Sequence, residues 1–279
     1  MRLGIITDVH LGTQKGPAQP EGQPAKLTGY AGPLTEQVVY GWRKRARPEL
    51  VLNLGDVLSD ASRELDRENY AHFCSLLEDA GAPVLHVAGN HDQVNLSDSD
   101  LLELWQLEQR WPQALRHEGS TAYAVDFGGL RFVILSTLWQ PPDGVFLGRG
   151  QLGFLDQCLG SAPGLCVLLT HQSLSEMSLV GNRWFEDVPH LALIQERAEI
   201  RRVLERHGNV LAAFNGHAHW NHIDVIAGVP FITVQSLTEN ATPEAVPTPA
   251  AASALVELSG SGVQLYVSGA QPVRFALRR

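Results

Sequence analysis

The sequence predicts an α/β protein built around a buried parallel sheet. Short apolar runs typical of buried strands alternate with longer segments in which apolar residues recur at helical spacing. This alternation is typical of strand–helix–strand units, in which helices cover the faces of a parallel sheet. Closely paired strand-like segments in the second half of the chain add antiparallel pairing. No segment is long enough to be a linker between two domains, so we expect residues 1–279 to form one domain.

Five apolar runs are predicted to be buried strands, and four other segments are predicted to be helices. The strands are residues 3–6, 50–54, 83–88, 165–169 and 210–214. The helices are residues 34–46, 67–80, 151–159 and 191–206. In the last of these, Ile200, Val203 and Leu204 share one face and charged residues occupy the other, as in a helix packed on a sheet.

Three pairs of short strands separated by tight turns are predicted to be β-hairpins. The pairs are 122–127 with 130–135, 221–226 with 229–235, and 255–258 with 263–267. Each of the three intervening turns contains glycine, which tight hairpin turns favour. Two stretches rich in Pro and Gly, residues 15–33 and 242–252, are predicted to be surface loops.

Composition and charge exclude several classes of protein. The chain has 21 Lys and Arg against 30 Asp and Glu, a formal net charge of −9, which argues against non-specific binding to nucleic acid. Its three cysteines show neither the short spacing of a thiolate metal site nor the even count of a disulfide framework. No apolar run is long enough to span a membrane, and the N-terminal apolar stretch is too short for a signal peptide. We therefore expect a cytoplasmic protein without a membrane partner.

Residues able to bind metal follow every one of the five predicted strands. In chain order they are Asp8 and His10, then Asp56, Asn90 and His171, then His217 and His219. Because ligands in open α/β sheets bind beyond the carboxyl ends of the strands, these residues should converge on one place. Each group taken alone is explained as well by a turn or a helix cap. Coincidence at five strand ends is a poor explanation, so together they predict a metal centre.

The residue types in this set favour particular metals. Carboxylate, amide and imidazole ligands without thiolates suit manganese, iron or zinc. The first and the last pair each lie two positions apart, a spacing that points both side chains the same way on extended backbone. Asp56 has two carboxylate oxygens, so it is able to bridge two ions.

The motifs around these residues resemble those of the calcineurin-like metallophosphoesterases. They occur in that family's order and are Asp8-Val9-His10, Gly55-Asp56, Gly89-Asn90-His91-Asp92, His171 and Gly216-His217-Ala218-His219. The resemblance implies a four-layer fold, in which two mixed β-sheets pack between helices. It also implies a pair of metal ions that share one carboxylate. One ion would be held by Asp8, His10, Asp56 and His219, and the other by Asp56, Asn90, His171 and His217.

The resemblance also implies a hydrolytic mechanism. Two ions about 3.5–4 Å apart clamp phosphate oxygens and lower the pKa of bound water, so that a metal-bound hydroxide attacks phosphorus. His91 would not bind metal, but would stabilise the transition state or protonate the leaving group. Asp92 would either orient His91 or cap the next helix.

Contacts with the substrate are predicted around the same motifs. The candidates are Asn90 and His91 at the phosphate, with Trp220 and Asn221 further out. Trp139, Trp184 and Trp220 lie near motif ends, where their rings either stack on a base or pack beneath a loop. Residues 14–33 form a long Pro- and Gly-rich stretch that we interpret as a flap over the site.

The compact length and the order of motifs resemble two branches of the family, the cyclic-nucleotide phosphodiesterases and the ADP-ribose and CDP-alcohol diphosphatases. We therefore predict an enzyme that hydrolyses a small phosphodiester, such as a cyclic nucleotide, and needs no nucleic-acid partner. Hydrolysis of nucleoside-diphosphate conjugates or of phosphomonoesters is the alternative. A non-catalytic scaffold on the same fold is a further alternative of a different class, and the complete ligand set argues against it.

Overall fold

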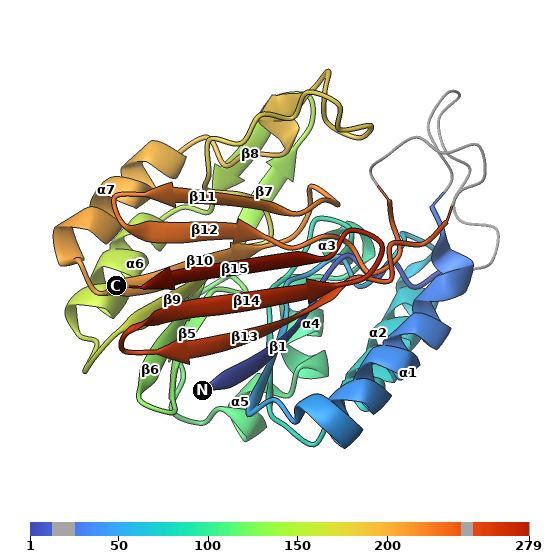
Figure 1. Ribbon diagram of the computed structural model, residues 1–279. Helices are drawn as coiled ribbons and strands as arrows, with labels where there is room; N and C mark the ends of the chain where they lie inside the picture. Colours follow the sequence, from blue (N-terminus) through green and yellow to red (C-terminus); the bar gives the residue numbers. More distant parts are fainter. Residues whose placement is uncertain (13–25, 241–247, 279) are drawn as a thin grey trace.

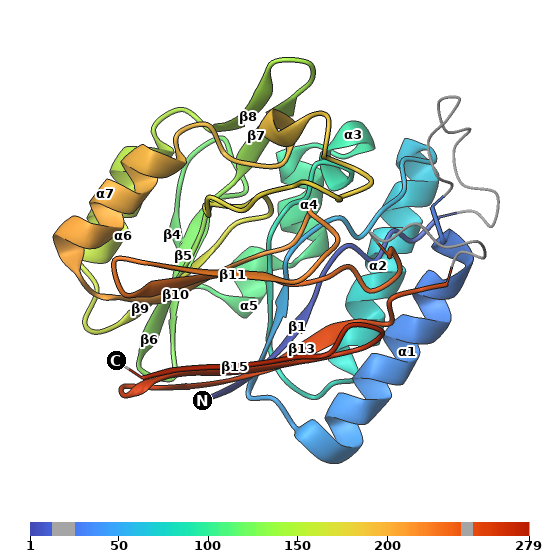
Figure 2. The same ribbon diagram turned by 45° about the horizontal axis from the view of Figure 1, so that its top comes forward.

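Two mixed β-sheets face each other and carry helices on their outer sides, which confirms the four-layer architecture expected from the sequence (Figure 1). The computed structural model describes residues 1–12, 26–240 and 248–278. Helices α1 (Ala31–Gly41) and α2 (Arg63–Glu78) lie beside the first sheet. Helices α6 (Gln151–Gly160) and α7 (Arg197–His207) lie beside the second sheet, at the opposite side of the molecule (Figure 2).

The first sheet combines a parallel half and an antiparallel half in the order β15-β14-β13-β1-β2-β3. The parallel strands are β1 (Arg2–Ile6), β2 (Leu50–Asn53) and β3 (Val84–His86). The antiparallel strands are β13 (Ser253–Ser259), β14 (Gly262–Ser268) and β15 (Val273–Arg278). β1 joins the halves, because it pairs in parallel with β2 and antiparallel with β13. The three parallel strands therefore end at one edge of the sheet.

The second sheet has the order β11-β12-β10-β9-β6-β5-β4 and a parallel centre formed by β6, β9, β10 and β12. Its strands are β4 (Leu115–Arg116), β5 (Tyr123–Phe127), β6 (Leu130–Ile134), β9 (Cys166–Leu169), β10 (Val210–Asn215), β11 (His222–Ile226) and β12 (Val229–Thr233). A separate two-stranded sheet consists of β7 (Thr137–Gln140) and β8 (Gly144–Leu147).

Local capping signals define several helix ends. α2 begins after Ser62, whose hydroxyl accepts the N–H of Leu65. α4 (Asp98–Leu104) begins with a capping box, in which Ser97 and Asp100 satisfy each other's backbone N–H. The other short helices are α3 (Asp92–Asn95), α5 (Leu107–Arg110), η1 (Thr28–Tyr30), η2 (Trp42–Ala46) and η3 (Pro189–Leu191). No helix in the described ranges is both long enough and apolar enough to cross a membrane.

The main apolar core lies between the two sheets. Ile5 and Leu52 from the first sheet and Phe132 and Phe214 from the second are all completely buried in it. A second cluster, which includes Leu155 of α6, lies between the second sheet and its helices. Burial of apolar side chains on the sheet faces holds the parallel strands firmly, so the loops at their carboxyl ends start from fixed positions.

The strands and hairpins predicted from the sequence are confirmed to within two residues at each end. The predicted start of a helix at residue 191 is wrong, because the chain first forms the 3-10 turn η3 at Pro189 and α7 begins only at Arg197. Four further features were not predicted: the hairpin of β7 and β8, the strand β4, the strand β15 and the short helices after β3. β15 was missed because its alternating residues are only partly buried, with charged arginines among them.

The two loops predicted from Pro and Gly content are only partly covered by the structure. Residues 13–25 and 241–247 lie outside the described ranges, so most of the flap assigned to residues 14–33 does too. Its last residues are not loop, since Thr28–Tyr30 form η1 and α1 begins at Ala31. Helix α1 therefore starts three residues earlier than predicted.

Tyr123 links the two sheets through hydrogen bonds to the edge strand of the first sheet. The hydroxyl of Tyr123, on β5, accepts the N–H of His86 at 2.9 Å and donates to the carbonyl of His86 at 3.0 Å. His86 lies on β3, the edge strand of the first sheet, so these backbone groups have no neighbouring strand to pair with. Tyr123 is buried, and water is therefore not available to replace its hydroxyl.

Replacing this hydroxyl should destabilise the fold. We expect Tyr123→Phe to lower the free energy of unfolding by about 1–3 kcal/mol, because two buried backbone groups lose their partner. Urea denaturation followed by circular dichroism measures the change. Tyr40→Phe is the matched control, since Tyr40 is 62% exposed. Equal urea midpoints for the two variants would show that the Tyr123 hydrogen bonds do not contribute to the free energy of unfolding.

Candidate metal centre

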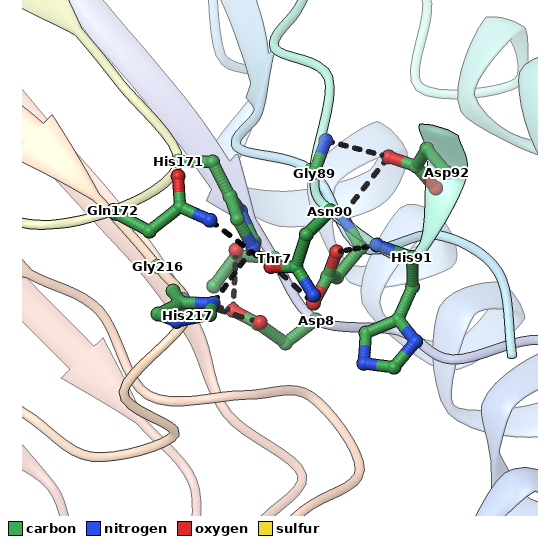
Figure 3. Close-up of polar contacts among 12 residues, drawn as sticks. Thr7, Asp8, Gly89, Asn90, His91, Asp92, His171, Gln172, Gly216 and His217 are labelled. Atoms are coloured by element: carbon green, nitrogen blue, oxygen red, sulfur yellow. Dashed lines mark hydrogen bonds and ion pairs between the residues drawn. The ribbon is translucent and has the colours of Figure 1, made fainter. Parts of the chain in front are cut away.

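The predicted ligand residues converge at the carboxyl ends of the parallel strands of both sheets. Asp8, His10, Asp56 and His219 form one group, and Asp56, His171 and His217 form a second; within each group the ligand atoms lie within 4.8 Å of one another. Asp56 belongs to both groups. Asn90 points its amide toward His171 and His217 in Figure 3, and its Oδ1 accepts a hydrogen bond from Gln172 at 3.0 Å.

In the second group the ligand atoms face one another at short distances. His171 Nε2 lies 3.2 Å from Asp56 Oδ2 and 3.2 Å from His217 Nδ1. The other nitrogen of each imidazole meets a backbone carbonyl, His171 Nδ1 at Leu54 (2.7 Å) and His217 Nε2 at Leu191 (2.9 Å). With these N–H groups directed outward, the other nitrogen of each ring faces the cluster, as in metal-bound histidines. A cation between these nitrogens fits this arrangement.

The first group repeats the pattern with a second carboxylate. His219 Nε2 lies 3.3 Å from Asp8 Oδ1 and 3.1 Å from His10 Nε2. His10 Nδ1 lies 3.1 Å from the carbonyl of Leu58, which assigns its N–H to that side and its lone pair to the cluster. His219 Nδ1 is buried and has no hydrogen-bond partner within the described ranges. Donor types, burial and inward lone pairs therefore all fit a cation site.

Five of these residues adopt left-handed backbone conformations. Their φ angles are 51° for Asp8, 53° for His10, 53° for Asp56, 66° for His217 and 57° for His219. Non-glycine residues seldom adopt positive φ, and each such residue costs of order 1 kcal/mol or more, so the surrounding structure must hold them there. The left-handed turns bend the chain sharply just beyond a strand and aim each side chain back at the cluster.

Two motif glycines permit a close approach between these turns. A Cβ on Gly89 would overlap the backbone nitrogen of Asp56, and a Cβ on Gly216 would overlap the Thr7 hydroxyl and the Asp8 carboxylate. Any other residue would therefore push two of the ligand loops apart.

The electrostatic environment sets the protonation of the ligand groups. Burial raises the pKa of Asp8 and Asp56, but the neighbouring histidines outweigh it and hold both pKa values below the usual range. Burial lowers the pKa of His10 well below its usual range and that of His217 to about 3, which keeps both rings neutral. For His171, burial is outweighed by the Asp56 carboxylate, and its pKa rises to about 9. A metal ion bound here must displace that proton.

The structure gives Asp92 a different role from either predicted one. Its Oδ2 accepts the N–H groups of Asp56 (3.0 Å) and Gly89 (2.9 Å), and its Oδ1 accepts those of Val57 (2.9 Å) and Leu58 (3.2 Å). Both oxygens are thus directed at backbone, and Asp92 neither orients His91 nor caps α3. It clamps the loop that carries Asp56 to the loop that carries Asn90.

The partner of His91 is Asp60, a residue that the sequence analysis did not identify. Asp60 Oδ2 lies 2.6 Å from His91 Nδ1, and the backbone N–H of His91 donates to Asp56 Oδ1 at 2.9 Å. Asp60 lies four positions after Asp56. The only indication of its role in the sequence was therefore that it is a second acidic residue on the same loop. The carboxylate fixes the ring orientation and assigns the Nδ1 proton, which leaves Nε2 as the nitrogen able to exchange a proton.

Two of the predicted substrate residues lie outside the pocket that contains the cluster. Trp220 packs on Met177, with its Nε1 directed at the sulfur at 3.4 Å. The amide of Asn221 bonds the carbonyl of Gln271 at 2.9 Å and the backbone of Gln235 at 3.1 Å. Both side chains support the loop after His219 and are not among the residues that line the pocket. Their assignment to substrate binding therefore stays a prediction that the lining of this pocket does not support.

The pocket at the cluster has a polar floor and an aromatic wall. Its volume is about 260 Å³, and the floor includes Asn90 and His91, as predicted for contacts near the phosphate. The aromatic wall consists of Trp139, Trp184 and Phe185, and the aliphatic Val188 and Leu191 also line the pocket. Phe185 packs on His217 with ring centroids 4.7 Å apart, so the aromatic wall borders the ligand groups directly.

Comparisons with known proteins agree with this geometry. Residues 1–221 match the calcineurin-like phosphoesterase family. A probable cyclic nucleotide phosphodiesterase from Synechococcus sp. is 28% identical over 226 residues, which cover 78% of this chain and 73% of that protein. The DNA double-strand break repair protein Mre11 from Aeropyrum pernix is 29% identical over 176 residues, 61% of this chain and 41% of that protein.

A solved structure extends the likeness to the whole chain. A dimetal phosphatase from Danio rerio superposes with a TM-score of 0.70 and covers 99% of this chain and 98% of its own, at 19% identity, so the likeness is one of fold. The family match spans all five strand ends that carry the ligand residues. The chain belongs to the calcineurin-like phosphoesterases.

Proposed function

We propose that this protein hydrolyses a small phosphodiester at two metal ions bridged by Asp56. The observation that carries the proposal is a pair of buried groups of candidate ligands that share the Asp56 carboxylate. His10, His171 and His217 each contact a backbone carbonyl with one ring nitrogen, so the other ring nitrogen faces the centre of its group. One ion would be held by Asp8, His10, Asp56 and His219, and the other by Asp56, Asn90, His171 and His217. The donor types suit manganese, iron or zinc.

The ions and the protein divide the chemistry between them. Two such ions, when bound, supply Lewis acidity and a nucleophile derived from water near neutral pH. The residues supply position: Asp92 holds the Asp56 and Asn90 loops together, and the backbone carbonyls fix the imidazole rings. Asn90 and His91 face the pocket in which the phosphate would lie.

His91 is the candidate general acid. Asp60 accepts its Nδ1–H, so Nε2 is the nitrogen that would donate a proton to the departing oxygen once a substrate lies in the pocket. Asp60 acts through His91 and is a positioning residue.

The aromatic wall supports a substrate with a flat organic group. The side chains of Trp139 and Trp184 line the pocket. A heteroaromatic base offers a stacking face to such indole rings. The pocket volume of about 260 Å³ is small for a ligand site, which favours a compact nucleotide diester such as a cyclic nucleotide. The likeness to a probable cyclic nucleotide phosphodiesterase supports the same class.

A substrate screen tests this proposal directly. Purified protein supplied with Mn²⁺, Fe²⁺ or Zn²⁺ is assayed on cyclic nucleotides, bis-p-nitrophenyl phosphate, ADP-ribose, CDP-alcohols and phosphomonoesters. We expect the highest kcat/KM for a cyclic nucleotide or another small diester. Preference for the diphosphate conjugates or monoesters would move the assignment to those alternatives. Two bound metals with no hydrolysis of any compound would identify a scaffold.

Replacing His91 should give a defect that depends on the leaving group. We expect His91→Ala to retain its metals but to lose about 10²-fold or more in turnover of an alkyl ester. The loss should be much smaller for a nitrophenyl ester, whose leaving group needs little protonation. Asp60→Asn should show a weaker defect with the same dependence, because it disturbs only the orientation of His91.

The exposed His72 provides the matched control, and His72→Ala should behave as the wild-type protein. Metal analysis by mass spectrometry accompanies the kinetics. If His91→Ala loses metal, the residue belongs to the ligand set. An equal loss for every leaving group would instead assign His91 to stabilisation of the transition-state charge.

A further inference from the structure

Lys26 places an amine in the pocket, and the chemistry described above gives it no role. Its Nζ lies 2.8 Å from His91 Nε2 and 3.3 Å from His10 Nδ1. It lines the same pocket as Asn90 and the ligand residues. The sequence analysis missed it because Lys26 follows no predicted strand and belongs to a stretch interpreted as a loop.

The chain after Lys26 fixes it relative to the cluster. The backbone N–H of Leu27 donates to Glu239 Oε1 at 2.7 Å. Glu239 belongs to the turn of Ser236, whose hydroxyl donates to the carbonyl of Asp8 at 2.7 Å and accepts the N–H of Glu239 at 2.8 Å. The turn that holds the Asp8 loop therefore also holds the segment that carries the amine.

Lys26 forms no ion pair with a carboxylate among the residues that the structure describes. Within the described ranges no carboxylate oxygen lies within 4.0 Å of its Nζ, and the acids around it already have partners. Asp60 bonds His91 at 2.6 Å, and Asp56 accepts the backbone N–H of His91 at 2.9 Å. The nearest polar atoms are imidazole nitrogens, which do not neutralise a cation. Such an ammonium in a pocket partly shielded from water is stabilised by an anion that enters the pocket.

We propose that Lys26 binds a non-bridging oxygen of the substrate phosphate and of the phosphomonoester product, which orthophosphate mimics. A phosphate that sits on the ligand groups with its leaving oxygen at His91 meets the amine beside that ring. This inference rests on the proposed function, and it assigns to Lys26 the phosphate group, whereas the aromatic wall faces the organic part. An amine adds most to phosphate groups with the most charge, so monoesters and orthophosphate depend on it more than diesters do.

Kinetics of matched lysine variants test the proposal. We expect Lys26→Met to keep its metals and to lose about 10- to 100-fold in kcat/KM for bis-p-nitrophenyl phosphate, the usual range for a hydrogen bond to a charged group. The inhibition constant of orthophosphate should rise by at least the same factor. Lys26→Arg should recover part of the loss, since it keeps a cationic donor. Lys44→Met, at an exposed position of η2, should have no effect.

A binding measurement gives an independent readout. The chain has three lysines, Lys15, Lys26 and Lys44, so labelling them with ¹³C at Cε gives a simple spectrum in which the Lys26→Met variant assigns one signal. Orthophosphate added to the metal-loaded protein at constant pH should shift the Lys26 signal saturably and leave that of Lys44 in place.

The outcomes separate this proposal from the proposed function. Unchanged kcat/KM and orthophosphate inhibition in Lys26→Met would overturn the assignment of Lys26. Loss of metal from that variant would overturn it too, because the amine would then support the ligand groups. If wild-type protein hydrolyses no phosphate ester while orthophosphate still shifts the Lys26 signal, the proposed function fails and the phosphate site stands.

Discussion

The strained turns beyond the parallel strands are the feature on which the rest of the site depends. Asp8, His10, Asp56, His217 and His219 all have φ between 51° and 66°, a region that ordinary residues avoid. At order 1 kcal/mol or more each, these five conformations require strong support from their surroundings. The contacts that support these turns also orient the ligand atoms before any ion binds. The backbone strain of the turns and the preorganisation of the ligand atoms therefore have the same structural origin.

Buried polar contacts hold the turns in place. Asp92 accepts four backbone N–H groups from the Asp56 and Gly89 loops, and Ser236 and Thr238 donate to the carbonyl of Asp8. Each of these side chains is at most 2% exposed, so water does not compete for the bonds. The same contacts position Lys26 and the Asp60–His91 pair. The hydrogen bonds that hold the loops therefore also determine which side chains line the pocket.

Sequence reasoning identified candidate ligand residues that the structure brings together, because residue type and position after a strand are both visible in the sequence. A carboxylate or imidazole after a buried apolar run is visible in the chain, and the sheet topology then brings five such positions together. It did not foresee the contacts of Asp92, Trp220 and Asn221, because these depend on which backbone groups and side chains the fold brings beside them. It missed Asp60 and Lys26 because their partners come from other loops, 31 and 65 residues away from His91.

Anomalous X-ray scattering from crystals grown with Mn²⁺ tests the central claim most directly. If the turns preorganise two ligand groups that share Asp56, maps calculated from data above the manganese edge will show two peaks per chain. These peaks should lie about 3.5–4 Å apart, with the Asp56 carboxylate between them. A single peak, or two peaks that Asp56 does not bridge, would contradict it.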